Sequence, residues 1–222
     1  MNPPRPKSRR RRPGLLLLLY LALALGFGVA NPLFEAPDEH YHYLTAAAVA
    51  QTGRLPSSRD PAFALGRQEA AQPPLYYLLA AALIAPFDGW PAADLLRLNP
   101  YARLGNAALP ANINHFVHTE AEAWPWRGPA LAAHLLRGLS AVFGLGTLLA
   151  IAAAGRELWP ARPGRGWLAA ALVAFLPQFA FLHASISNDP PVVMLASLAL
   201  WQLIRLWRRG PRPAWLLALG AT

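Results

Sequence analysis

Long stretches without charged residues constrain this chain more than any other feature. The first runs over 14–34 and is about as long as the ~20 apolar residues that a helix needs to cross a bilayer. Further apolar blocks cover 129–155, 166–188 and 190–207, and blocks of this kind exceed what a soluble core requires. A last block, 213–222, ends after about two helical turns, as the start of a truncated fifth span would. The sequence therefore predicts an all-α fold, a polytopic transmembrane helix bundle.

The positions of the basic residues predict how the bundle is oriented. Arginines and Lys7 cluster at 5–12, 156–165 and 205–212, each time next to an apolar block. The positive-inside rule places such clusters in the cytoplasm. We therefore expect a multi-pass protein of the cell membrane, in which residues 1–13 form a basic cytoplasmic tail. Because the net charge of +9 arises mainly from these clusters, we expect no nucleic-acid partner.

The start of the chain allows a second interpretation. A basic segment, an apolar run and the small residues of Gly28–Ala30 also fit a cleaved signal peptide. We favour a retained membrane anchor, because the apolar run continues to Phe34 and further spans follow. In both cases the residues after Phe34 lie outside the cell. The chain contains no cysteine, which excludes disulfide bonds and thiolate chemistry.

The segment 35–128 is predicted to be a long external first loop that contains interfacial helices. Pro37–Gln51 has a proline at a helix start, acids in the first turn and a glycine after its end, and we expect it to lie at the membrane surface. Residues 74–87 are apolar but too few to span a bilayer, which favours an interfacial or re-entrant segment. Residues 88–128 are rich in Pro, Asn and Trp and are expected to form a loop.

A group of acids and histidines follows the first apolar run, in the sequence LFEAPDEHYHYL. On a helix that begins at Pro37, Asp38 and His42 share a face, and Glu39 and His42 also converge. An ionised carboxylate there can accept a proton from a substrate hydroxyl, or bind a divalent cation together with a histidine. The alternative is an ordinary solvated helix start, in which acids are favoured by the helix dipole.

The order of motifs favours the first of these interpretations. An apolar span is followed by APDEHYHYLTAAAVAQTGRLP, then by QPPLYYLL and then by HLLRGLSAVFGLGTLLAIAAAGREL. This order resembles the N-terminal part of GT-C-type membrane glycosyltransferases, both the family 39-like bacterial enzymes and the related DUF2142-like proteins. The resemblance covers about residues 14–210. It implies a lipid-linked sugar donor and an external lipid, polysaccharide or protein acceptor.

The resemblance also implies roles for individual residues. The catalytic carboxylate falls on Asp38, with Glu39 as its neighbour, and a divalent metal ion, if used, would be held by Asp38, Glu39 and His42. Gln72 occupies the place of an element that lines the donor site. Substrate-binding roles are further expected for three residues, namely Arg137, Asn188 and Asp189. For Arg137 the reason is independent of the resemblance: a cation in a membrane helix is costly, which suggests a contact to Asp38 or to a phosphate. Extension of its side chain to the lipid headgroups explains it equally well.

We therefore predict a glycosyltransferase that moves a sugar from a polyprenyl-phosphate donor to an external acceptor. The chain would be an N-terminal fragment of such an enzyme. Two alternatives remain, a multi-pass transporter or flippase-like protein and a non-enzymatic membrane anchor. The predicted loop contains a further group of polar residues, His115, His118, Glu120 and Glu122. They are potential ligands, although such residues in a loop more often simply face solvent.

Overall fold

The computed structural model describes residues 13–87, 92–93, 95–102 and 114–222. Within these residues the regular secondary structure is helical, and an isolated antiparallel bridge joins Leu98 and Phe116. The predicted all-α fold class is confirmed. The α-helices are α1 (Pro13–Ala30), α2 (Glu39–Thr52), α3 (Leu75–Ile84), α4 (Gly128–Leu158), α5 (Gly164–Ala174), α6 (Pro177–Leu182), α7 (Asp189–Arg209) and α8 (Pro213–Gly220), and the 3-10 helices are η1 (Pro61–Ala71) and η2 (Glu120–Glu122).

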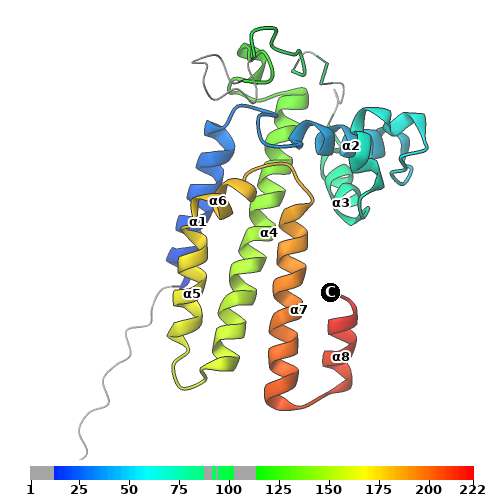
Figure 1. The fold of residues 1–222 in the computed structure, drawn as a ribbon. Helices are drawn as coiled ribbons and strands as arrows, with labels where there is room; N and C mark the ends of the chain where they lie inside the picture. Colours follow the sequence, from blue (N-terminus) through cyan, green and yellow to red (C-terminus); the bar gives the residue numbers. More distant parts are fainter. Residues whose placement is uncertain (1–12, 88–91, 94, 103–113) are drawn as a thin grey trace, which may run out of the picture.

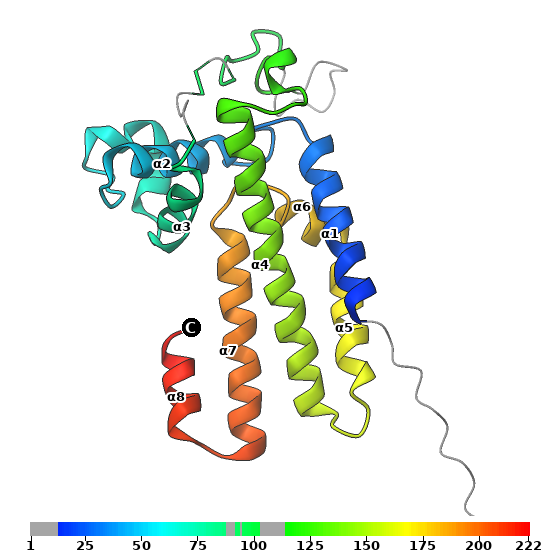
Figure 2. The same cartoon turned by 180° about the vertical axis from the view of Figure 1, so that it is seen from behind.

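Helix α4 forms the centre of the bundle. It packs against α1 and α5 on one side and against α7 on the other, as both views show (Figures 1 and 2). The helices α1, α4 and α7 are each long and apolar enough to cross a membrane. Their outward faces carry exposed leucines, for example Leu18 and Leu200, which a bilayer would cover. These three helices coincide with the first, second and fourth predicted spans.

The third predicted span, 166–188, is not one continuous helix. It is divided into α5 and α6 by a break at Phe175 and Leu176. The backbone of Leu176 is extended (φ −71°, ψ 120°), because the ring of Pro177 disfavours a helical conformation in the residue before it. After α6, residues 183–188 form an irregular turn that leads into α7. This turn lies near the start of α2, and it contributes to the site described below.

Beside one end of the bundle, α2, η1 and α3 pack together as a small helical unit (Figure 1). Helix α2 begins at Glu39, two residues later than predicted, and Asp38 occupies its N-cap position. The core of this unit is aromatic and includes Phe63, Tyr43 and Tyr77. Helix α3 is only 10 residues long, so the prediction that residues 74–87 are too short to span a bilayer agrees with the structure.

The described basic clusters lie at the opposite end of the bundle from this unit. The α4–α5 connection carries Arg162, with Arg165 in the first turn of α5, and the α7–α8 connection carries Arg212, with Arg208 in the last turn of α7. Figure 1 shows both connections at the same end. The first basic cluster, 5–12, lies outside the described residues. The bundle thus separates a basic end from the end that carries α2, η1 and α3.

Candidate active site

The centre of the site is a buried ion pair between Glu39 and Arg137. The Glu39 side chain is fully buried, and that of Arg137 is 2% exposed. The guanidinium donates to the carboxylate from Nε to Oε1 at 2.8 Å and from Nη2 to Oε2 at 2.7 Å. Such a two-bond arrangement fixes both the distance and the orientation of the two groups.

This ion pair joins four segments of the chain. Arg137 also donates to three backbone carbonyls in the last turn of α1 and just after it, those of Gly28, Asn31 and Pro32. Glu39 accepts from the backbone N–H groups of Phe34 and Ile186, each at 2.9 Å. The end of α1, the start of α2, the N-terminal third of α4 and the turn before α7 are thereby held together.

The ion pair leaves neither partner free for the roles that the sequence suggested. A guanidinium has five N–H donors, and the five hydrogen bonds of Arg137 use them all. No N–H therefore remains for a substrate phosphate. Each oxygen of Glu39 already accepts two hydrogen bonds, which disfavours a metal ion there. In this structure Glu39 and Arg137 instead hold together the chain segments next to Asp38.

Asp38 lies next to Glu39 but points the other way, into solvent. Its backbone is left-handed (φ 56°, ψ 5°), a conformation that Asp and Asn tolerate better than most residues. Its carbonyl accepts from the N–H groups of Tyr41 and His42, which starts α2. Phe34, four residues earlier, also has a positive φ (67°). The bends at Phe34 and Asp38 turn Glu39 inwards and leave Asp38 exposed.

Asp38 lines a polar cavity of about 380 Å³ between the α2–η1–α3 unit and the turn before α7. The cavity brings together most of the site residues predicted from the sequence, which lie far apart along the chain. These are Asp38, His42, Gln72, Asn188 and Asp189. Sequence reasoning missed other polar residues that line it, namely Gln68, Glu69, Gln178, Ser185 and Ser187.

The buried wall of the cavity contains a network of His42, Tyr77 and Glu69. The His42 Nδ1 lies 2.9 Å from the Tyr77 hydroxyl and 3.5 Å from the Glu69 Oε2. Burial lowers the pKa of His42, while the carboxylate of Glu69 opposes that shift. Burial also raises the pKa of Tyr77, and the negative charge of Glu69 adds to this effect. At neutral pH the site thus contains a neutral imidazole and a neutral phenol.

Glu69 is the functional candidate that the sequence gave least reason to select. It is a single acid in an alanine-rich stretch, where charged residues usually face solvent. One signal was present, since Glu69 and Gln72 are three residues apart. In a 3-10 helix that spacing places side chains on the same face. Both residues line the cavity.

The polar group of the outer loop forms a separate cluster. The Nε2 of His118 lies 2.9 Å from Glu35, and its Nδ1 lies 2.9 Å from Glu122. Glu35 also accepts from the backbone N–H groups of His115 and Phe116, at 2.8 and 3.0 Å. This cluster fastens the loop to the connection between α1 and α2.

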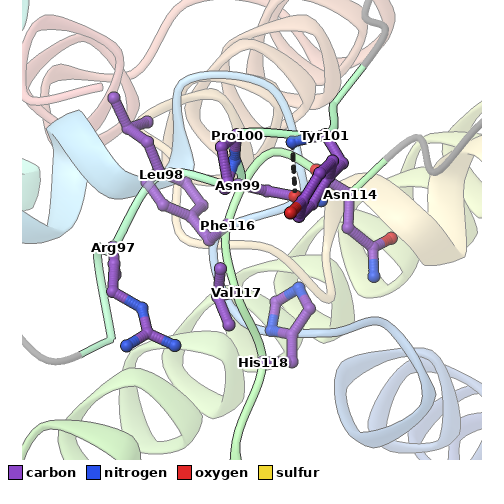
Figure 3. A pocket seen from close by; sticks show the side chains of 9 residues that line it. All are labelled: Arg97, Leu98, Asn99, Pro100, Tyr101, Asn114, Phe116, Val117 and His118. Carbon is purple, nitrogen blue, oxygen red and sulfur yellow. Dashed lines mark hydrogen bonds between the residues drawn. The ribbon is translucent and has the colours of Figure 1, made fainter.

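A cavity of about 640 Å³ adjoins this loop cluster (Figure 3). Arg97, Asn99 and Tyr101 line it from one segment, and Asn114 and His118 from another. The Asn99 side chain is held by bonds to Tyr101 N–H and the Asn114 carbonyl. Among the residues that the sequence suggested for catalysis or substrate binding, none lines this cavity.

The described side chains do not form the predicted metal site. Within the described ranges, no group of three or more His, Cys, Asp and Glu side chains is arranged to hold a metal ion. Asp38 is exposed, whereas the oxygens of Glu39 point to Arg137. Of the residues proposed as ligands, Glu39 is thus turned to Arg137, whereas Asp38 and His42 line the cavity.

Fold and site together define a helical, multi-pass membrane protein with a polar cavity at one end of its bundle. Residues 133–222 match the family of dolichyl-phosphate-mannose-protein mannosyltransferases. The match confirms, for this segment, the resemblance to membrane glycosyltransferases that the motifs predicted. Arg137, Asn188 and Asp189 lie inside the matched segment, and Asp38 and Gln72 lie before it. No curated protein and no solved structure matches the chain.

Proposed function

We propose that the protein is a membrane glycosyltransferase that moves a sugar from a polyprenyl-phosphate donor to a hydroxyl group of an external acceptor. The family match over 133–222 supports the class of reaction. The position of the polar cavity supports a reaction on the outer side of the membrane, because the cavity lies at the end of the bundle opposite the described basic clusters. In this proposal the N-terminus is cytoplasmic and the cavity faces outwards.

The observation that carries the proposal is the exposed carboxylate of Asp38 at this cavity. In the reaction, the acceptor oxygen forms a bond to the anomeric carbon of the sugar. The bond from that carbon to the phosphate oxygen breaks, and its electron pair leaves with the lipid phosphate. The hydroxyl proton goes to the carboxylate of Asp38, which acts as general base.

The surroundings of Asp38 fit this role. The buried pair of Glu39 and Arg137 holds the adjacent backbone, so the carboxylate is positioned before substrate binds. Asn188 and Asp189 face it from the start of α7, and Gln72 from the end of η1. A transporter is less well supported, because the charges of Glu39 and Arg137 are paired with each other and are not free to bind a transported solute.

The test is a transfer assay in membranes with polyprenyl-phosphate mannose, the donor type suggested by the name of the matched family. The Asp38→Asn variant keeps the shape and tolerates the left-handed backbone, but it loses the proton-accepting charge. We expect transfer to fall at least about a hundredfold at equal protein levels. Glu120→Gln removes an exposed carboxylate of η2 and serves as the matched control. Normal transfer by Asp38→Asn would refute the assignment of the general base.

A further inference from the structure

The carboxylate of Glu69 is buried without a Lys or Arg partner in the described part of the chain. Its side chain is 4% exposed, and the groups near its Oε2 are His42 Nδ1 and the Tyr77 hydroxyl, both at 3.5 Å. Leaving a buried carboxylate without hydrogen bonds is costly. Glu69 therefore requires that at least one of these neighbours donates a hydrogen to it.

This requirement determines which nitrogen of His42 carries the proton. The single hydrogen of the Tyr77 hydroxyl is donated to Glu69. The Tyr77 oxygen, 2.9 Å from His42 Nδ1, must then accept a hydrogen from that nitrogen. The neutral imidazole is thus held as the Nδ1–H tautomer, and its Nε2 keeps a lone pair.

The lone pair of Nε2 belongs to the ring that lines the cavity. All hydrogen bonds described for His42 side-chain atoms use Nδ1, which leaves Nε2 for a ligand. The other side chains around the cavity include amides and hydroxyls, such as Gln68, Gln178 and Ser185, and none of its described lining residues is Lys or Arg. Such a lining suits an uncharged polyol better than a phosphate.

We propose that this cavity binds the sugar of the donor, and that His42 Nε2 accepts a hydrogen bond from a sugar hydroxyl. Glu69 and Tyr77 are positioning residues that act through the tautomer of His42. This inference rests on the proposed function and extends it, because it assigns the cavity to the sugar and not to the lipid phosphate. The phosphate would be bound outside this cavity.

The first test observes the tautomer directly and needs no activity. The full chain, labelled with ¹⁵N-histidine, is studied by NMR in detergent micelles, and the signals of His42 are assigned from their loss in His42→Asn. We expect a protonated Nδ1 and an unprotonated Nε2. In Glu69→Gln the amide can donate to the Tyr77 oxygen, which frees the hydroxyl hydrogen for Nδ1. The ring should then shift towards the Nε2–H tautomer.

The second test measures transfer kinetics with polyprenyl-phosphate mannose. A ring with Nε2–H can no longer accept the hydrogen bond, so Glu69→Gln should raise KM for the donor about tenfold while kcat changes little. Glu122→Gln is the matched control, because Glu122 contacts Nδ1 of another histidine, His118, at 2.9 Å. It should alter the signals of His118 and leave the His42 tautomer and the KM unchanged.

The outcomes separate this inference from the proposed function. An Nε2–H tautomer in the wild type overturns the positioning role whatever the activity. A tautomer shift in Glu69→Gln without a change in KM overturns the sugar contact. Absence of transfer by the wild type overturns the proposed function and the sugar contact with it, while the NMR measurement still decides whether Glu69 and Tyr77 orient the ring.

Discussion

The guanidinium of Arg137 and the carboxylate of Glu39 are joined by two hydrogen bonds of 2.7 and 2.8 Å, and the residues are 98 positions apart in the sequence. A second pair, Arg209 and Glu157, has nearly the same geometry, with two bonds of 2.8 Å. The two pairs differ in burial. The Arg209 side chain is 53% exposed, against 2% for Arg137.

This difference predicts losses of stability of very different size for the same substitution at the two arginines. Arg137→Gln leaves a buried charge on Glu39 and removes donors from three carbonyls, so it should lower the free energy of unfolding by about 3–5 kcal/mol. Arg209→Gln removes a bond that solvent already screens, and its effect should stay below about 1 kcal/mol. Equilibrium unfolding in mixed micelles measures both. Equal losses would show that burial does not determine the strength of these pairs.

The glycines of α4 predict a second contrast. A Cβ on Gly155 would overlap the backbone of Gly166 in α5, whereas a Cβ on Gly138 would have no atom within 4 Å. Gly138→Ala should be neutral or stabilise the protein by up to about 1 kcal/mol, since alanine is the better helix former. Gly155→Ala should destabilise it, because α4 and α5 must separate. Thermal unfolding of the two variants tests this, and a stable Gly155→Ala protein would contradict the close packing.

The cluster around His118 predicts a pH dependence of the outer loop. Burial lowers the pKa of His118, but hydrogen bonds to Glu122 and Glu35 outweigh this effect, and the pKa is raised above its ordinary 6.5. A raised pKa means that the stabilisation is fully present below about pH 6.5 and is lost as the pH rises through the raised value. The contacts that hold the loop through His118 should therefore weaken when the pH rises above this raised pKa.

Hydrogen exchange of the His115 and Phe116 amides, which donate to Glu35, measures this loosening. After correction for intrinsic exchange rates, their protection should decrease as the pH rises. His118→Asn removes the titrating group, and its protection should no longer follow the pH in this range. The same pH dependence in His118→Asn would assign the effect to another residue.

The orientation in the membrane is tested by accessibility. The chain has no cysteine, so single cysteines can be introduced without a background signal. We expect an impermeant thiol reagent to label the exposed position 65 or position 189 in intact cells, and to label position 9 or 208 only after the membrane is opened. The physical reason is the retention of basic segments on the cytoplasmic side. Labelling of 208 but not 65 in intact cells would contradict this orientation.

Much of the fold follows from local sequence. In a bilayer each backbone polar group must be satisfied within its own segment, so a long apolar run has few choices other than a helix. For this reason α1, α4 and α7 lie where the apolar blocks predict them. The break before Pro177 also has a local cause, because the residue before a proline avoids the helical conformation, although one span was predicted over 166–188. The first turn of α2 was harder to place, since Asp38 caps it in a left-handed conformation.

The site depended on tertiary structure. The sequence identified Asp38, Gln72, Asn188 and Asp189 separately, but only helix packing places them around one cavity. It also marked Arg137 as an unusual cation in an apolar run, while its partner became evident only when α2 and α4 met. Glu69 was overlooked, because its burial against His42 and Tyr77 depends on how η1 lies on α2 and α3. Backbone hydrogen bonding is local and can be read along the chain, whereas side-chain pairing depends on which helices pack together.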